Sequence, residues 1–228
     1  MNKKYLFIHI PKTAGLTIKA GLKRVGLSIP FSSKSRHPHF PLCRYIREEY
    51  PINSLFKFCF IRNPIDRFAS AFFYLSSGGT FVGGTPVHEE ICAYLQNNYK
   101  DINDFVSSFS KAEDFVKNRV HFRPQFNFIC QRENVGVDFI GTVENLQEDF
   151  IFILKKLGIK INGNYATRET RSWGPIKINL TLPHANVCRG RKNYTDMFTP
   201  ESIDILRSIY AKDFELYKQV LSNRTQLP

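Results

Sequence analysis

Residues 11–17 combine a lysine, two threonines and a glycine, which are residue types that hold a phosphate group. Lys12 supplies a positive charge, Thr13 and Thr17 supply hydroxyls, and Gly15 allows close approach of the backbone to a ligand. The order differs from a standard P-loop, in which Gly-Lys-Ser/Thr closes the motif, because Lys12 precedes Gly15. An ordinary strand-to-helix turn with a solvated lysine is the alternative interpretation.

The segments on either side of this loop predict a strand and then a helix. Residues 5–10 are an apolar run of strand length that Pro11 ends. After the loop, Ile18 and Leu22 fall on one helical face, and Gly26 supplies a stop. A loop between a strand and a helix points backbone N–H groups and the positive end of the helix dipole at an anion.

A second segment, which starts at residue 55, has the same strand-to-helix pattern. Residues 55–61 are apolar except for Lys57, and Asn63 and Pro64 are typical of an N-cap and a first helical residue. Arg62 is therefore expected at the carboxyl end of a strand, with Ser70 two turns into the next helix. In parallel sheets, ligands bind at that edge. An ion pair from the arginine to a nearby carboxylate is the alternative.

Together the two segments resemble the PAPS-dependent sulfotransferases, where PAPS is 3′-phosphoadenosine 5′-phosphosulfate. The similarity is greatest to the carbohydrate branch, which includes chondroitin, HNK-1 and uronyl 2-O enzymes and small bacterial relatives. Leu16 departs from the family, which commonly has Thr or Ser there. Further similar segments extend over nearly the whole chain, at 121–125, 138–146, 182–186 and 210–217.

The resemblance implies transfer of a sulfuryl group from PAPS to a carbohydrate hydroxyl by in-line attack. It also implies that the first loop holds the 5′-phosphosulfate and that Arg62 and Ser70 hold the 3′-phosphate. Lys12 is expected to be catalytic, because it would stabilise charge on the leaving phosphate oxygen. The residues expected to bind the donor are Pro11, Lys12, Thr13, Ala14, Gly15, Leu16, Thr17, Arg62, Ser70, Arg191 and Lys192.

A sugar hydroxyl is a poor nucleophile, so transfer to it requires a general base, and histidine suits neutral pH. His121 lies in a segment that resembles one near the acceptor in relatives, and it is the base predicted here. His88, His184 and Glu144 remain alternatives, although Glu144 is expected to form a buried ion pair. A surface histidine at the start of a helix is the simpler interpretation of His121.

The alternation of strands and helices predicts an α/β fold, with three layers (α/β/α) around a central, mostly parallel sheet. A length of 228 residues predicts one domain, 1–228. His9 is expected to be structural, and His37 and His39 lie in a polar loop. The glycine-rich segment 76–86 is interpreted as an acceptor loop or a solvent loop. Residues 162–192 are expected to be largely irregular.

The net charge of +12 predicts an anionic partner. Nucleic acid is not expected, because the basic residues are scattered and carry no nucleic-acid-binding motif. The donor, with an anionic glycan acceptor, accounts for the same charge. The five cysteines include no CxxC pair, and no histidine cluster has metal spacing, so no metal is expected and a reducing compartment fits.

No signal peptide or membrane-spanning apolar run is recognised, so the sequence predicts a cytoplasmic protein. The competing hypotheses are a P-loop-like kinase that uses ATP and magnesium, and a non-catalytic nucleotide- or glycan-binding protein. The order of glycine and lysine, and the lack of a convincing metal-binding aspartate after a strand, disfavour the kinase. A remote position of His121 and Glu144 from the pocket would favour the binding protein.

Overall fold

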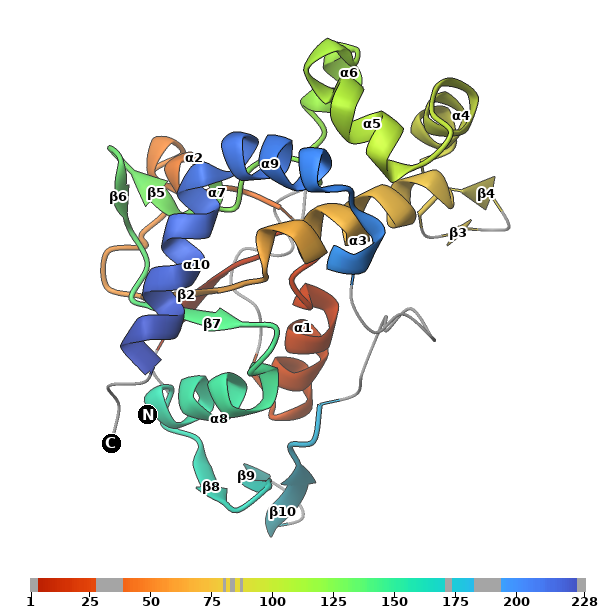
Figure 1. The fold of residues 1–228 in the computed structure, drawn as a ribbon. Coiled ribbons are helices and arrows are strands. Elements are labelled where there is room, and N and C mark those ends of the chain that lie inside the picture. The colour runs from red at the N-terminus through yellow and green to blue at the C-terminus, as the bar shows by residue number, and fades with distance from the viewer. Residues whose placement is uncertain are drawn as a thin grey trace. The chain divides into compact units, whose positions relative to one another are not determined.

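The protein is described here from a computed structural model, drawn as a ribbon in Figure 1. Its described residues form two compact units. Unit 1 comprises Met1–Ile61 and Gln125–Val187, and unit 2 comprises Arg62–Pro124 and Cys188–Pro228. The described residues are 4–27, 39–79, 81–82, 85–86, 88–170, 174–182 and 194–224.

A parallel sheet in the order β1-β2-β7 is the centre of unit 1. Its strands are β1 (Tyr5–Ile8), β2 (Phe56–Ile61) and β7 (Phe139–Thr142). Ile8 pairs with Cys59, and Ile61 pairs with Thr142, so the carboxyl ends of all three strands lie at one edge of the sheet. Every residue of β1 is buried, as a strand covered on both faces requires.

Helices α1 (Gly15–Arg24) and α8 (Leu146–Lys156) pack on this sheet. Residues of α1 spaced three or four apart form its buried face, as the sequence predicts. Phenylalanines from alternate positions of β2 complete this core, so one face of the strand is aromatic. The central residues of the cluster are Ile18, Leu22, Phe58, Phe60, Phe150, Ile153 and Leu154.

A second sheet follows α8, where an irregular chain was expected. Strands β8 (Lys160–Asn162), β9 (Tyr165–Thr170) and β10 (Gly174–Asn179) form an antiparallel sheet in the order β10-β9-β8. The expectation for residues 162–192 is therefore wrong for these strands. The two residues between the strands, Gly163 and Asn164, are typical of a hairpin turn, because Asn162 pairs with Tyr165 and Gly163 has φ 57°.

The remaining elements of unit 1 are short. They are α2 (Leu42–Arg47), α7 (Phe126–Ile129), β5 (Cys130–Gln131) and β6 (Asn134–Val135).

Unit 2 is built around α3 (Pro64–Ser76). Asn63 caps α3 as predicted: its side-chain oxygen accepts hydrogen bonds from the N–H groups of Ile65 (3.0 Å) and Asp66 (3.4 Å). Phe68 is in ring contact with Phe105, Phe109 and Phe122. This aromatic core positions the segment that precedes Phe122.

Two further helices of unit 2 are α9 (Pro200–Ile209) and α10 (Ala211–Arg224). Thr199 caps α9 by accepting a hydrogen bond from the N–H of Ser202 at 3.2 Å. The rest are β3 (Phe81–Val82), β4 (Thr85–Pro86), α4 (Glu89–Asn98), α5 (Ile102–Ser108), η1 (Phe109–Lys111), α6 (Asp114–Lys117) and η2 (Thr195–Met197).

Within the described part of the chain, no helix has the length and apolar character needed to cross a lipid bilayer.

Candidate functional site

The loop between β1 and α1 has an unusual backbone. Lys12 has φ 67° and Ala14 has φ 60°, while Thr13, between them, does not have a positive φ. Such an alternation turns successive N–H groups toward one side and forms a concavity that binds anions. The Thr13 hydroxyl donates to the carbonyl of Ile10 at 2.9 Å, so this side chain holds the loop in shape. We therefore expect Thr13 to contact a phosphate through its backbone N–H.

The start of α1 suits a negative ligand. No side chain caps the described first turn of α1, and no acidic residue lies in it. The first N–H groups of a helix have no intrahelical partners and carry the positive end of the dipole. Lys12 is half-buried in the same loop, Thr17 is buried, and Leu16 is 61% exposed. The residues present therefore fit a phosphate or phosphosulfate group, and exposed Leu16 adds an apolar surface beside it.

His9 fixes the position of Gly15 in this loop. A Cβ atom on Gly15 would overlap the His9 imidazole, so only glycine fits there. The His9 ring stacks on Phe7 with centroids 5.7 Å apart and is 4.3 Å from the His39 ring. The His39 Nδ1 lies 3.0 Å from the His9 carbonyl oxygen. The structural role predicted for His9 is thus supported, and the ring of a second histidine, His39, packs against it.

Arg62 and Ser70 belong to unit 2. Arg62 directly follows β2, and its guanidinium carbon lies 5.4 Å from the centroid of the Tyr194 ring. Ser70 is half-buried on α3, two turns after the Asn63 cap. Both residues thus lie where the sequence predicts, at the end of a strand and on the following helix. A cation with five donors and a hydroxyl can together bind a phosphate.

Three rings meet at His121. The centroid of the His121 ring lies 5.4 Å from that of Tyr74 and 5.2 Å from that of His88, and the Tyr74 and His88 centroids are 5.6 Å apart. His121 is 7% exposed and lies in a turn, so it is not a surface histidine at a helix start. No helix begins at His121, because α7 begins only at Phe126. Two of the candidate bases, His88 and His121, are therefore in contact.

Gly79 permits this three-ring cluster. It has φ 75°, and a Cβ at this position would lie 2.5 Å from His88 Cδ2 and 3.1 Å from Tyr74 Cζ. Gly79 is in the glycine-rich segment that the sequence offers as an acceptor loop. Gly79 of that segment therefore lies against His88 and Tyr74.

Unit 2 also contains two buried residues of opposite charge. Arg67 and Asp213 are each 1% exposed, and burial lowers the pKa of the Arg67 guanidinium while the Asp213 carboxylate opposes that shift. The Tyr210 hydroxyl, whose pKa burial raises, donates to the Phe122 carbonyl at 2.7 Å. This contact fixes the backbone beside His121.

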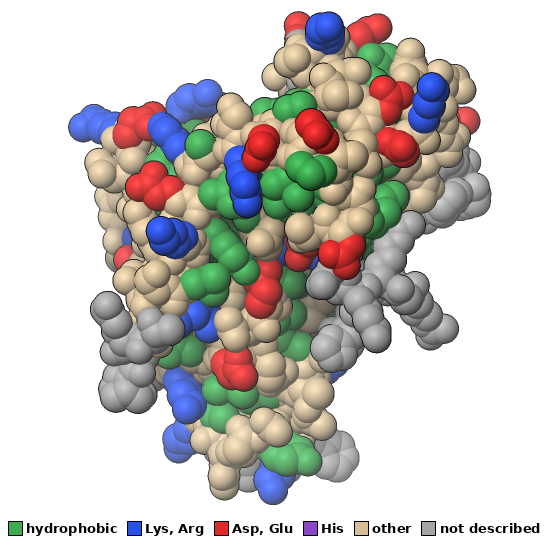
Figure 2. Space-filling view, viewed as in Figure 1, with side chains coloured by type: hydrophobic (Ala, Val, Ile, Leu, Met, Phe, Trp, Pro, Cys, Tyr) green, Lys and Arg blue, Asp and Glu red, His purple; other side chains and the backbone are tan. Residues whose placement is uncertain are grey.

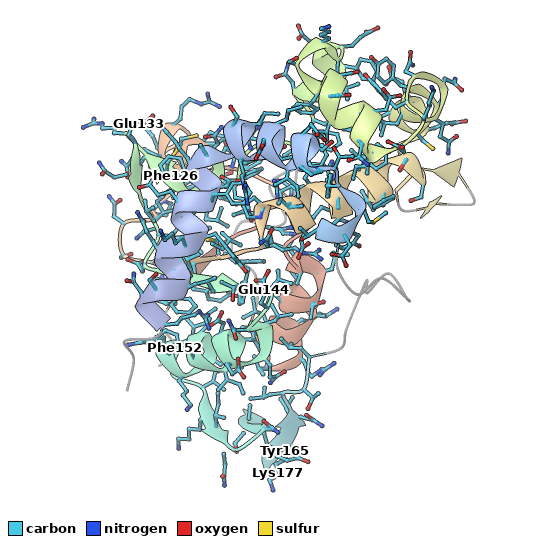
Figure 3. All side chains as sticks on the ribbon, viewed as in Figure 1. Phe126, Glu133, Glu144, Phe152, Tyr165 and Lys177 are labelled. Atoms are coloured by element: carbon cyan, nitrogen blue, oxygen red, sulfur yellow. The ribbon has the colours of Figure 1, made fainter. Side chains whose placement is uncertain are left out.

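Arg191, Lys192 and His184 are outside the described residues. Glu144 is exposed after β7 and is labelled in Figure 3, so the burial expected for it is wrong. The buried carboxylate at the end of β7 belongs instead to Asp149, whose Oδ2 accepts the N–H of Thr142 at 2.7 Å.

His39 and Tyr74 were not among the site residues predicted from the sequence. For His39, the only sequence signal is its position in a polar, turn-rich loop. Tyr74 shares a face of α3 with Ser70 at helical spacing, and this pattern could have found it. Among the described residues, three or more His, Cys, Asp or Glu side chains do not gather into a group that could hold a metal ion.

Comparisons with known proteins identify the class to which this fold and site belong. The model of the sulfotransferase family matches residues 2–218. The chain therefore belongs to the sulfotransferase family, and the α/β fold with a central parallel sheet that the sequence predicts is confirmed.

Two relatives are similar over nearly the full chain. Carbohydrate sulfotransferase 14 from Danio rerio is 25% identical over 239 residues, which cover 97% of this chain. The chain spans 61% of the length of that relative. Mouse sulfotransferase SULT7A1, solved in complex with PAP, is 16% identical with a TM-score of 0.44, covering 99% of this chain and 89% of that one.

Proposed function

We propose that this sulfotransferase moves a sulfuryl group from 3′-phosphoadenosine 5′-phosphosulfate to a hydroxyl of a carbohydrate. The main support for the proposal is the backbone conformation of the β1–α1 loop. There Lys12 and Ala14 have positive φ angles, and the described first turn of α1 has no capping side chain and no acidic residue. Family membership and the similarity to a carbohydrate sulfotransferase support the reaction and the acceptor class.

The chemistry assigned to the loop is charge stabilisation. In the transfer, a bond forms between the acceptor oxygen and sulfur while the bond from sulfur to the phosphate oxygen breaks. Lys12 would stabilise the negative charge that grows on that phosphate oxygen, and the N–H groups of residues 13–17 would hold the other phosphate oxygens. Arg62 and Ser70 would bind the 3′-phosphate.

Proton removal is assigned to His121. The acceptor hydroxyl loses its proton as it attacks sulfur, and the imidazole would accept it. The contacts that support this assignment are those with His88 and Tyr74, because they hold the His121 ring in a defined place. His39 is a second candidate, favoured by its 4.3 Å ring contact with His9, which itself packs over Gly15.

The distribution of charge is compatible with this ligand class. On the face shown in Figure 2, acidic and basic side chains are interspersed and do not form one basic stripe. A stripe of that kind is the usual sign of a nucleic-acid interface. The net charge of +12 is thus better assigned to small anionic ligands and an anionic acceptor than to nucleic acid.

Calorimetry with two nucleotides tests the donor. The protein is titrated with 3′-phosphoadenosine 5′-phosphate without metal, and with ATP in the presence of magnesium. Metal-free binding of the first nucleotide, at least about tenfold tighter than that of magnesium-ATP, is the expected result, since the 3′-phosphate would add charge-assisted hydrogen bonds. Preference for magnesium-ATP would favour the kinase hypothesis, and binding of neither would overturn a nucleotide donor.

A further inference from the structure

The outward face of the β8–β9–β10 sheet carries side chains that sulfuryl transfer, as proposed, does not use. We call this face the platform and define it by two rows that run across the three strands. The first row is Asn162, Tyr165 and Asn179, and the second is Lys160, Thr167 and Lys177. In each row the β9 residue is the middle one, paired with a residue on either side.

The platform faces solvent, and the opposite face of its sheet packs on the hydrophobic core of unit 1. The residues between its rows, Ile161, Ala166 and Ile178, belong to the hydrophobic core of unit 1 or pack against it. Because side chains alternate along a strand, the platform residues point the other way, and all six are exposed. Tyr165, 42% exposed, presents a large aromatic surface to water.

The first row has the chemistry of a sugar-binding surface. The ring of Tyr165 offers an apolar face on which a sugar ring can lie, and an asparagine on each side can hydrogen-bond sugar hydroxyls. Asn179 Oδ1 accepts the N–H of Thr181 at 2.8 Å, which fixes the orientation of this amide. One side of the row is thus held in place before any ligand binds.

The second row has the chemistry of an anion-binding surface. Lys160 and Lys177 flank Thr167 from the two outer strands, so their backbones lie about 10 Å apart. Lys177 Nζ is 5.1 Å from the centroid of the Tyr165 ring, and Figure 3 shows the two side chains together at the end of the sheet. The two rows, all of whose residues are described, contain no acidic residue. An anion between Lys160 and Lys177 would therefore interact favourably with both positive charges.

We propose that the platform binds a chain of an anionic polysaccharide, with a sugar ring on Tyr165 and a sulfate or carboxylate group between Lys160 and Lys177. This inference rests on the proposed function in that the polysaccharide is the polymer that carries the acceptor hydroxyl. The platform binds the polymer and takes no part in the transfer itself. It would raise the affinity for long acceptors over short ones.

Binding of a chondroitin sulfate octasaccharide to the full-length protein, measured by calorimetry without nucleotide, tests the proposal. Replacing both platform lysines, Lys160→Ala with Lys177→Ala, is expected to weaken binding about tenfold or more, and Tyr165→Ala by a similar factor. Tyr165→Phe keeps the ring and is expected to change affinity less than about twofold. All variants concern exposed side chains, and their melting temperatures are compared with that of the unmodified protein.

The matched control is on α8 of the same unit. Lys156 Nζ lies 5.2 Å from the centroid of the exposed Phe152 ring, which Figure 3 labels, so this pair resembles Lys177 and Tyr165 away from the platform. The double variant Lys155→Ala with Lys156→Ala removes the same charge and is expected to change affinity less than about twofold. An equal loss of affinity in the control variant would refute the platform proposal, because net charge alone would then explain binding of the octasaccharide.

Two further outcomes would also overturn the proposal. The first is undetectable binding of the octasaccharide, in which case the lysines serve only to protect the edges of the sheet. The second is equal competition by single-stranded DNA of the same charge, which would show that sugar chemistry is not recognised. Nucleotide binding is measured on the same samples. If the protein binds the nucleotide but not the octasaccharide, only the platform proposal is refuted. If it does not bind the nucleotide, the result contradicts the proposed function.

Discussion

The imidazole rings of His88 and His121 meet edge to face, with centroids 5.2 Å apart and an interplanar angle of 81°. The sequence does not predict this contact, because α4, α5 and α6 lie between the two residues in the chain. Their contact, shared with Tyr74, makes the region around His121 the best-defined candidate for proton transfer in unit 2.

The first prediction concerns Lys12. Lys12→Ala is expected to reduce sulfuryl transfer about 100- to 1000-fold, because a preorganised donor to the leaving phosphate oxygen is lost. Alanine keeps a Cβ, so the backbone strain at φ 67° stays the same. The measurement is initial-rate kinetics with the sulfated nucleotide. Lys23→Ala, at an exposed position in the last turn of α1, is the control and should leave the rate unchanged. Equal rates for both variants would refute the role of Lys12.

The second prediction separates the candidate bases. His121→Ala is expected to lower kcat about 100-fold or more, because proton transfer is lost, while the affinity for 3′-phosphoadenosine 5′-phosphate stays within about twofold. His39→Ala and His88→Ala are measured alongside it. A greater loss of kcat in His39→Ala than in His121→Ala would identify His39, in unit 1, as the general base.

The third prediction concerns the 3′-phosphate. Arg62→Ala is expected to weaken binding of 3′-phosphoadenosine 5′-phosphate about tenfold to a hundredfold, because charge-assisted hydrogen bonds are lost. Binding of adenosine 5′-phosphate, which lacks the 3′-phosphate, should change little. Arg207→Ala, at an exposed ion pair 3.4 Å from Asp204, is the control. If both nucleotides lose affinity equally, Arg62 does not recognise the 3′-phosphate.

The fourth prediction tests the buried charge in unit 2. Asp213→Asn is expected to reduce the free energy of unfolding by about 3–5 kcal/mol, because the buried Arg67 guanidinium loses its opposite charge. Asp204→Asn, in an exposed ion pair, should cost less than about 1 kcal/mol. Urea unfolding followed by circular dichroism measures both. Similar values for the two variants would mean that Asp213 does not stabilise Arg67.

The fifth prediction concerns the thiols. Burial raises the pKa of Cys59 above its ordinary value of 9.0, whereas Cys43 is exposed. Because a thiol reacts as thiolate, iodoacetamide at neutral pH should modify Cys43 first and Cys59 only after unfolding.

The raised pKa of Cys59 stabilises the folded state below pH 9.0, and this contribution should be lost as pH rises above that value. Mass spectrometry of peptides identifies the sites, and early labelling of Cys59 would contradict its burial.

The sequence by itself determined the parts of the protein that depend on neighbours in the chain. The strand, loop and helix around Lys12, and the caps at Asn63 and Thr199, follow from short patterns of residue types, because hydrogen bonds and periodicity over a few residues create them. The parallel sheet also follows, since strands that alternate with helices leave few other arrangements.

Only the tertiary structure decided which distant residues share a surface. The contact of His9 with His39, the burial of His121 and the facing charges of Arg67 and Asp213 arise from packing between elements remote in sequence. The platform needed the pairing register of three strands, because a shift of one residue would turn Tyr165 toward the core. Local patterns fix backbone conformation, whereas side-chain partners depend on how the hydrophobic cores assemble.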